Sequence, residues 1–441
     1  MTYLPHWPIP STLGNREIDY EAVFERMSIV LNNLGNPHKN IPPVIHIAGT
    51  NGKGSTATLL AEIYTQAGYN AHSYTSPHLH DCNERITLAS EGIREKISDS
   101  FLFEVMEESR LAAKDTPLTF MEGFTIGALL AFSKIKADIL IMECGMGGRI
   151  DATNIVEKKI ATVITPISFD HTEYLGNNIE RIALEKAMII RPNTPLICAS
   201  QPQKALEIID ILAQDQKIQT HYYDRDFEII VNEENGEFDL RFGDEVIEKL
   251  AKPSMPGEHQ YINSATAIST ILALKDKFLV TEENINNALK NTSWPSRLEK
   301  ITNKLSTLLT NPESELYIDG AHNEAGAFAL ARWLQEENDK NPKETHLICG
   351  FSRHKCRSAF LEKFDKIAQI TAIRVDGEPN PESAQKIAEI GKSIGLQISI
   401  AEDLIQAITN IENNNNPKRV LICGSLHLAR DVRKFSRMIA H

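Results

Sequence analysis

The sequence has no long apolar run and no excess of positive charge, and each absence excludes a class of protein. No uninterrupted apolar stretch reaches the roughly 18 residues that a membrane span needs. The N-terminus lacks the basic and apolar regions of a secretory signal. The net charge of −13 argues against a general nucleic-acid surface. We therefore expect a protein with neither a membrane nor a nucleic acid as partner.

Cysteine is also scarce. The six cysteines lie far apart, at positions 82, 144, 198, 349, 356 and 423, with no C-x-x-C pair. Reduced thiols in a cytoplasmic protein are the simplest interpretation. Internal repeats and long low-complexity segments are absent too. At 441 residues, 42% of them hydrophobic, the chain is long enough to build two or more cores.

A glycine-rich stretch at residues 44–56 is the most informative feature that is present. A β-branched run ends in a turn with three glycines, and a helical pattern follows. Such a turn points backbone N–H groups at an anion, and the helix N-terminus adds partial positive charge. Lys53 would supply a cation for the outer phosphates of ATP, and Ser55 or Thr56 an oxygen near Mg²⁺. Gly54 directly after Lys53 breaks the strict P-loop pattern, so a turn that binds nothing is the alternative. The strand, helix and lysine together favour ATP binding.

Glu143 follows four apolar residues and precedes a turn with three glycines. ATP enzymes place a Mg²⁺ ligand in this position. The alternative is a solvated acid at the end of a strand. The apolar run before it and the glycines after it favour the metal ligand.

Two further predicted strands, 71–75 and 160–165, also end in polar residues. The first leads to Ser76 and His78, and the second leads to Asp170 and His171. Ligands of open α/β sheets gather at the carboxyl ends of the strands, so these side chains are well placed. A surface histidine and a structural histidine–aspartate pair are the alternatives.

The sequence pattern in the second half of the chain indicates a boundary between two domains. A hairpin is expected where 227–231 and 238–242 flank Asn235-Gly236, and a helix opens at 260–265. The segment 291–297 is polar and contains a proline, which is typical of a linker. A second alternation of strands and helices follows, with strands expected at 316–318, 346–349, 370–375, 396–400 and 420–423. We expect two domains, 1–292 and 293–441.

Nine motifs occur in one order along nearly the whole chain: GTNGKGS at 49–55, TSPHL at 75–79, NERI at 83–86, ECGMGGRIDATN at 143–154, DHT at 170–172, EKA at 185–187, WPSR at 294–297, DGAHN at 319–323 and CGS at 423–425. In this series the chain resembles the dihydrofolate synthase/folylpolyglutamate synthase family of the Mur ligase superfamily. The resemblance implies an α/β fold with an N-terminal P-loop ATP-binding domain, whose sheet is mostly parallel. It also implies a C-terminal Rossmann-like α/β domain.

The same resemblance implies a set of site residues. ATP would contact residues of the glycine loop and three further positions: Asn51, Gly52, Lys53, Gly54, Ser55, Asn263, Arg297 and Asp319. Mg²⁺ would lie on Ser76, Glu143 and His171, with K⁺ as an optional second cation. The pterin-bearing substrate would contact His78, Thr119, Phe120, Met121, Ile150, Asp151 and Ala152. Lys186 matches a lysine that the family carbamylates.

The implied reaction joins L-glutamate to dihydropteroate, to the γ-carboxylate of tetrahydrofolate, or to both, through an acyl phosphate. Lys53 and the metal would neutralise charge on the transferred phosphoryl group. Asp151 would position or deprotonate the incoming amine. A monomer is expected by resemblance.

Two other functions compete with this one. A Mur enzyme acting on a UDP-linked precursor shares the phosphate loop, but only 48 residues precede Gly49, too few for a UDP-binding domain. A P-loop protein that uses ATP as a switch would catalyse little. Release of ADP that depends on both a pterin and glutamate separates all three.

Overall fold

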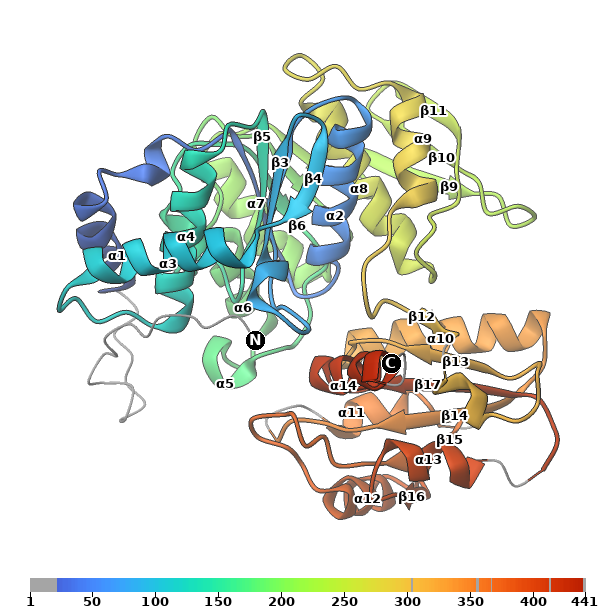
Figure 1. Ribbon diagram of the computed structural model, residues 1–441. Helices are drawn as coiled ribbons and strands as arrows, with labels where there is room; N and C mark the ends of the chain where they lie inside the picture. Colours follow the sequence, from blue (N-terminus) through green and yellow to red (C-terminus); the bar gives the residue numbers. More distant parts are fainter. Residues whose placement is uncertain (1–21, 303, 354–356, 366, 412–413, 439–441) are drawn as a thin grey trace. The chain divides into compact units, whose positions relative to one another are not determined.

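The structure, a computed structural model, describes residues 22–302, 304–353, 357–365, 367–411 and 414–438 (Figure 1). The chain divides into two compact units. The first groups the chain through Ile167 with Asn178–Ser254 and Tyr261–Thr292. The second groups Ser168–Asn177 and Met255–Gln260 with the chain from Ser293 onward.

The first unit is built on an eight-stranded sheet in the order β4-β3-β2-β5-β1-β6-β7-β8. Its strands are β1 Val44–Ala48, β2 Ala71–Tyr74, β3 Ile86–Ser90, β4 Ile93–Lys96, β5 Ile139–Glu143, β6 Lys159–Ile164, β7 Leu196–Cys198 and β8 Thr220–Tyr222. All neighbouring pairs are parallel except β2–β3 and β3–β4. β1 therefore lies in the interior of the sheet, between β5 and β6.

Helices pack against both faces of this sheet. They are α1 Ala22–Asn33, α2 Lys53–Gln66, α3 Asp99–Ala113, α4 Phe120–Lys134, α6 Ile179–Ala187, α7 Gln203–Asp215, α8 His259–Ala273 and α9 Glu282–Asn291, with short 3₁₀ turns η2 Pro37–Lys39, η3 Cys82–Arg85 and η4 Ala152–Ile155. Side chains alternate across a strand, so β1 serves two cores. Ile45 and Ile47 pack in the core that contains α2, α8 and α9, whereas Val44 packs with α1, α3 and α4.

A small antiparallel sheet extends the first unit. It orders β11-β10-β9, from β9 Phe227–Val231, β10 Phe238–Phe242 and β11 Glu245–Leu250. β9 and β10 pair from Phe227↔Phe242 to Val231↔Phe238, so the predicted hairpin is present.

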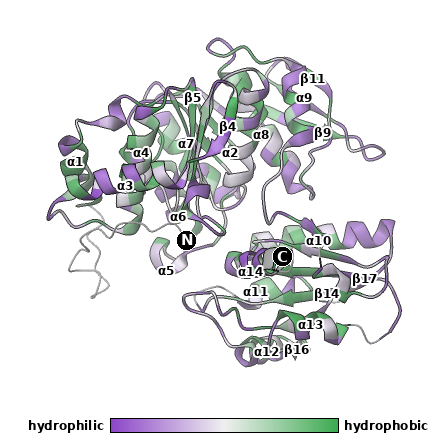
Figure 2. Cartoon of the chain, in the orientation of Figure 1, coloured by the Kyte–Doolittle hydropathy of each residue, from purple (hydrophilic) through white to green (hydrophobic). Residues whose placement is uncertain are grey.

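The second unit holds a six-stranded sheet in the order β12-β13-β17-β14-β15-β16. Its strands are β12 Glu299–Ile301, β13 Glu315–Ile318, β14 Glu344–Cys349, β15 Gln369–Ala372, β16 Ile398–Ile400 and β17 Lys418–Cys423. Its helices are α5 Thr172–Leu175, α10 Glu324–Lys340, α11 Arg357–Glu362, α12 Ala384–Ser393, α13 Leu404–Ile411 and α14 Leu426–Met438, with η5 Ser306–Leu308. Only β12 runs antiparallel to its neighbour. In each unit the hydrophobic residues concentrate on the strands of the sheet (Figure 2).

The predicted α/β class with mostly parallel sheets is confirmed. Each strand expected in the second half overlaps an observed one, with ends that differ by a few residues. α6 ends at Ala187, where Met188 N–H bonds the Leu184 carbonyl and Pro192 follows soon after. No helix in the described part of the chain is both long and apolar enough to span a membrane. The five described cysteines are free thiols, and Cys356 lies outside the described residues.

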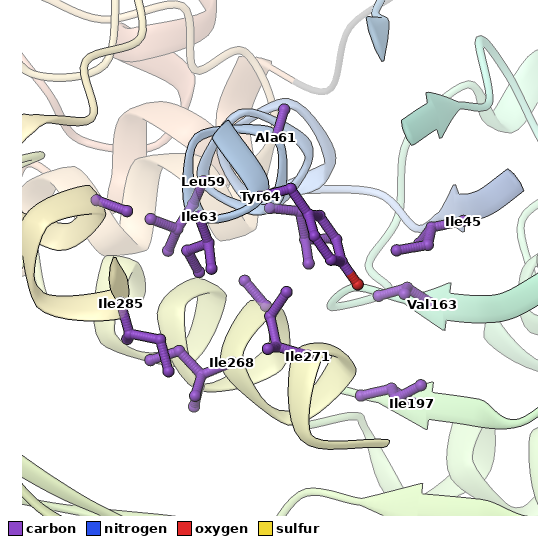
Figure 3. Close-up of a cluster of buried hydrophobic side chains, with 14 of the residues drawn as sticks. Ile45, Leu59, Ala61, Ile63, Tyr64, Val163, Ile197, Ile268, Ile271 and Ile285 are labelled. Carbon is purple, nitrogen blue, oxygen red and sulfur yellow. The ribbon is translucent and has the colours of Figure 1, made fainter. Parts of the chain in front are cut away.

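The largest core of the first unit joins α2 to α8 and α9. Figure 3 shows Leu59 and Ile63 of α2 pointing toward Ile268 of α8 and Ile285 of α9, and all four side chains are almost completely buried. This contact fixes the helix that begins at the glycine loop.

We expect Ile268→Ala to lower the free energy of unfolding of the first unit by about 3 kcal/mol, because it leaves a cavity in this core. Denaturant unfolding followed by circular dichroism measures the loss. The matched control is Ile211→Ala on α7, where the side chain is 62% exposed and the expected change is within about 0.5 kcal/mol. Equal losses in the two variants would contradict the assignment of the core.

Candidate functional site

The glycine loop lies between the end of β1 and the start of α2. The N–H groups of Thr50 and Asn51 donate to the carbonyl oxygen of Pro166, at 3.0 and 3.2 Å. Gly49 has φ +148°, and a Cβ there would lie 1.9 Å from Thr165 Oγ1. Only glycine fits this close approach of two strand ends.

Two lysines converge on one carbonyl oxygen of this loop. Lys53 Nζ donates to the Gly49 oxygen at 3.1 Å and to the Thr50 oxygen at 3.2 Å. Lys186 Nζ, from α6, donates to the same Gly49 oxygen at 2.8 Å and is buried. Two ammonium groups beside a helix N-terminus create a strongly positive position, which suits a polyphosphate.

The structure also brings Asn263 of α8 to the loop. Gly52 has φ +83°, and a Cβ there would lie 2.2 Å from Asn263 Oδ1. Gly54 and Ser55 are buried in the first turn of α2. The residues expected to contact ATP within the first unit are therefore neighbours.

Ser76 and Glu143 meet at the carboxyl ends of β2 and β5. The Ser76 N–H donates to Glu143 Oε2 at 3.2 Å, and the glutamate side chain is buried. Ser76 Oγ is buried and has no hydrogen-bond partner in the part of the chain that the structure describes. Among the described residues, no three His, Cys, Asp or Glu side chains form a metal-binding group. His171, the third expected ligand, belongs to the segment that groups with the second unit.

Gly145 leaves a small space beside these two residues. A Cβ at Gly145 would lie 3.3 Å from Asp151 Oδ2, 3.4 Å from Met121 Cε and 3.6 Å from Ser76 Oγ. The expected substrate residues Met121 and Asp151 therefore line one position with the expected metal ligand Ser76. Ile150 and Ala152 flank Asp151 along the chain, and Ala152 is buried.

Arg85 also belongs to this cluster, although its sequence motif predicted no role for it. Its guanidinium lies 5.7 Å from the ring centroid of Phe120 and 5.6 Å from that of Phe124. Arg85 Nε donates to His78 Nδ1 at 2.8 Å, and Nη1 donates to Met121 Sδ at 3.4 Å. It is only 6% exposed and forms no ion pair with a described carboxylate. Arg85 thus orients three of the predicted substrate residues.

The N-terminus of α4 presents the remaining predicted substrate residue. Thr119 caps this helix, since its Oγ accepts a hydrogen bond from Glu122 N–H at 3.2 Å. Phe120 follows in the first turn and is 43% exposed. The cap therefore fixes the direction in which the aromatic ring enters the cluster.

Asp151 is held by three donors. Its Oδ1 accepts from Thr153 N–H at 3.0 Å and from Thr153 Oγ1–H at 2.5 Å, and its Oδ2 accepts from Met146 N–H at 2.8 Å. These bonds fix the carboxylate in one orientation beside Gly145.

The second unit carries its own cluster of predicted residues. Asp319, at the end of β13, accepts from Leu298 N–H at 2.8 Å and Ala321 N–H at 2.7 Å. Arg297 Nη1 would lie 2.9 Å from a Cβ at Gly320, so Arg297 and Asp319 are neighbours.

Asp170 forms a second pair in this unit with His322, a residue for which the sequence pattern predicted no role. Asp170 Oδ2 lies 3.1 Å from His322 Nε2. His171 follows Asp170 with φ +50°, and its N–H donates to Asp170 Oδ1 at 2.8 Å. Asp170 therefore links His171 to the DGAHN motif.

Comparison with known proteins relates this geometry to one family. Residues 47–271 match the Mur ligase middle domain, and residues 302–435 match the C-terminal domain of dihydrofolate synthetase. The chain is 32% identical to the dihydrofolate synthase/folylpolyglutamate synthase of Escherichia coli over 92% of its own length and 90% of that protein.

Solved structures agree with these matches. E. coli FolC in complex with DHPP and ADP has a TM-score of 0.82 and 25% identity, covering 100% of this chain and 96% of that one. The bifunctional synthase of Yersinia pestis, complexed with AMPPNP and a Mn ion, has a TM-score of 0.80 and 26% identity, with 93% of each chain covered.

The fold and the lysine-lined glycine loop define an ATP-dependent ligase of the Mur type. Within that class, the chain belongs to the dihydrofolate synthase/folylpolyglutamate synthase family.

We expect Gly145→Ala to fold but to lower kcat/KM for the acid substrate by about tenfold, because its methyl group occupies the space between Asp151, Met121 and Ser76. Steady-state kinetics measure the change, and the KM for ATP should stay within about twofold because the glycine loop is untouched. An unchanged kcat/KM in a folded variant would contradict a substrate position at Gly145.

Proposed function

We propose that this ligase joins L-glutamate to the carboxylate of dihydropteroate and to the γ-carboxylate of tetrahydrofolate, at the expense of ATP. The observation that carries the proposal is the convergence of Lys53 and Lys186 on Gly49 at the N-terminus of α2. The ADP and DHPP complex of the E. coli relative supports the choice of nucleotide and acid substrate.

The reaction begins with activation of the acid. A carboxylate does not condense with an amine unaided, because its oxygen is a poor leaving group. Transfer of the γ-phosphoryl group of ATP makes an acyl phosphate, and the α-amino group of glutamate displaces phosphate from it. Lys53 neutralises charge on the transferred group, and the backbone N–H groups at the start of α2 orient the phosphates.

The residues at the ends of β2 and β5 fit a divalent cation. Ser76 offers a buried oxygen without a described partner, and Glu143 offers a buried carboxylate beside it. Oxygen ligands of this kind suit Mg²⁺, which neutralises phosphate charge when bound. We include His171 as the third ligand by resemblance. The Mn ion of the Yersinia relative supports a divalent metal, and K⁺ stays an optional second cation.

Asp151 suits the role of a substrate-orienting carboxylate better than that of a base. Three donors already hold its two oxygens and fix the direction in which the carboxylate faces Gly145. We propose that Asp151 accepts an N–H of the pterin beside Met121 and Phe120. His78 and Thr119 complete the substrate contacts.

We assign residues 1–292 to the ATP- and folate-binding domain and residues 293–441 to the glutamate-binding domain. Arg297 and Asp319 would contact ATP from the second domain. Free thiols at all five described cysteines support a cytoplasmic enzyme, and we propose that it acts as a monomer.

We expect ADP release only when ATP, L-glutamate and a folate acceptor are all present. A coupled ADP assay with dihydropteroate and with tetrahydrofolate measures both activities. Lys53→Met should lower kcat by about a hundredfold or more, since it removes charge stabilisation from the transferred phosphoryl group. ADP release that requires a UDP-linked acceptor, or no acceptor at all, would favour a Mur enzyme or an ATP switch instead.

Lys186 gives a second test, because an amine and a carbamate differ in charge. We expect Lys186→Ala to lower kcat by about a hundredfold, and added formate or acetate to restore part of it if Lys186 is carbamylated. Rescue by methylamine but not by formate would mean that the free ammonium is the active form. Leu184→Ala, at a 42% exposed position on the same helix, is the control.

A further inference from the structure

A buried polar chain lies behind Asp151, and no step of the proposed reaction uses it. His46, in the middle of β1, is completely buried. Its Nε2 lies 2.8 Å from Thr153 Oγ1 and 3.1 Å from Cys144 Sγ. Thr153 is also completely buried, and its hydroxyl in turn contacts Asp151. A strand that ends in the glycine loop is thereby connected to the substrate-orienting carboxylate.

The contacts determine where the protons lie. Thr153 has one hydroxyl proton, which it donates to the Asp151 carboxylate at 2.5 Å rather than to Cys144 Sγ at 3.5 Å. Its oxygen then accepts a hydrogen bond from His46 Nε2–H. His46 Nδ1 is buried without a partner in the described part of the chain, and an orphaned lone pair there costs less than an orphaned N–H.

The charge state of His46 agrees with this arrangement. Burial lowers the pKa of His46 well below its ordinary value, so the ring is neutral and carries a single proton. Lys159 and Arg191 lower that pKa further. The direction of donation is therefore fixed from His46 through Thr153 to Asp151.

This direction leaves one carboxylate oxygen for a ligand. Thr153 occupies Asp151 Oδ1 with two donors, whereas Oδ2 accepts only Met146 N–H from the described residues. Oδ2 is also the atom that faces the space at Gly145, beside Met121. If the Asp151 carboxylate rotated, Oδ2 would no longer face the space at Gly145.

We propose that His46 and Thr153 are positioning residues that hold Asp151 Oδ2 toward the Gly145 space, where it accepts a hydrogen bond from an N–H donor of the heterocyclic acid substrate. The inference rests on the proposed function, because it takes Asp151 as a substrate contact. The new element is that affinity for the acid substrate depends on the Thr153 hydroxyl and the His46 imidazole, neither of which contacts the substrate.

Thr153→Val tests this proposal, because valine keeps the shape and removes the hydroxyl. We expect the KM for the acid substrate to rise about tenfold, as for a lost hydrogen bond to a charged group, while the KM for ATP stays within about twofold. Thr153→Ser keeps the hydroxyl and should recover most of the affinity. His46→Phe keeps a ring but lacks the donor, so it should raise the same KM even if the valine variant fails to fold.

Thr162→Val is the matched control. Thr162 lies on β6 of the same sheet and is completely buried, but its Oγ1 has no partner among the described residues. Its substitution should leave both KM values unchanged.

Three outcomes would overturn the proposal. If folded Thr153→Val or His46→Phe has an unchanged KM for the acid while the wild type is active, the positioning role is wrong but the proposed function stands. If the KM for ATP rises in these variants as much as the KM for the acid, the network stabilises the sheet in general and does not specifically position Asp151. A wild-type chain that releases no ADP with any folate acceptor would overturn the proposed function together with this inference.

Discussion

The carbonyl oxygen of Gly49 is the contact on which the first unit's site depends. It accepts hydrogen bonds from two ammonium groups, one from the first turn of α2 and one from α6. Two cations repel each other, so they share one neutral acceptor only where the surrounding structure holds them in place. The close fit of Gly49 against Thr165 and of Gly52 against Asn263 provides that constraint. The fold therefore holds both lysine side chains at the loop before any ligand binds.

β1 connects the two halves of this site. Its carboxyl end becomes the glycine loop, and its alternating side chains reach both cores. His46 points to the same side as Val44 and there meets Thr153, in the turn that follows β5. The phosphate loop and the substrate-orienting carboxylate thus share one strand of the sheet interior. A shift of that strand would move both at once, which is a reason to expect nucleotide and acid sites to keep a fixed separation within this unit.

Much of this could be predicted from local patterns in the sequence. The α/β class, the hairpin at Asn235-Gly236 and the glycine loop each depend on residues close together in the chain. The strand-end rule also placed Ser76 and Glu143 at one edge of the sheet.

Other features depend on contacts between distant residues, so no local pattern reveals them. The antiparallel edge exists because β3 pairs with β2 and β4 pairs with β3, and the sequence of each strand does not show which neighbour it will have. Its motif suggests that Arg85 is an ordinary surface cation, and its contact with two phenylalanine rings requires α4 to lie beside the end of η3. The grouping of Ser168–Asn177 with the second unit, through Asp170 and His322, is equally non-local.

A single hydroxyl group connects the hairpin of β9 and β10 to helix α8. Tyr261 Oη donates to the carbonyl oxygen of Gly236 at the hairpin turn, at 2.8 Å. Tyr261 lies two residues before Asn263, in the helix that abuts Gly52. The turn between β9 and β10 is therefore connected through α8 to the glycine loop. A label or affinity tag inserted at this turn would disturb the Tyr261 hydrogen bond and, through α8, the position of Asn263 beside the glycine loop. A reporter on this enzyme is therefore better attached at another site.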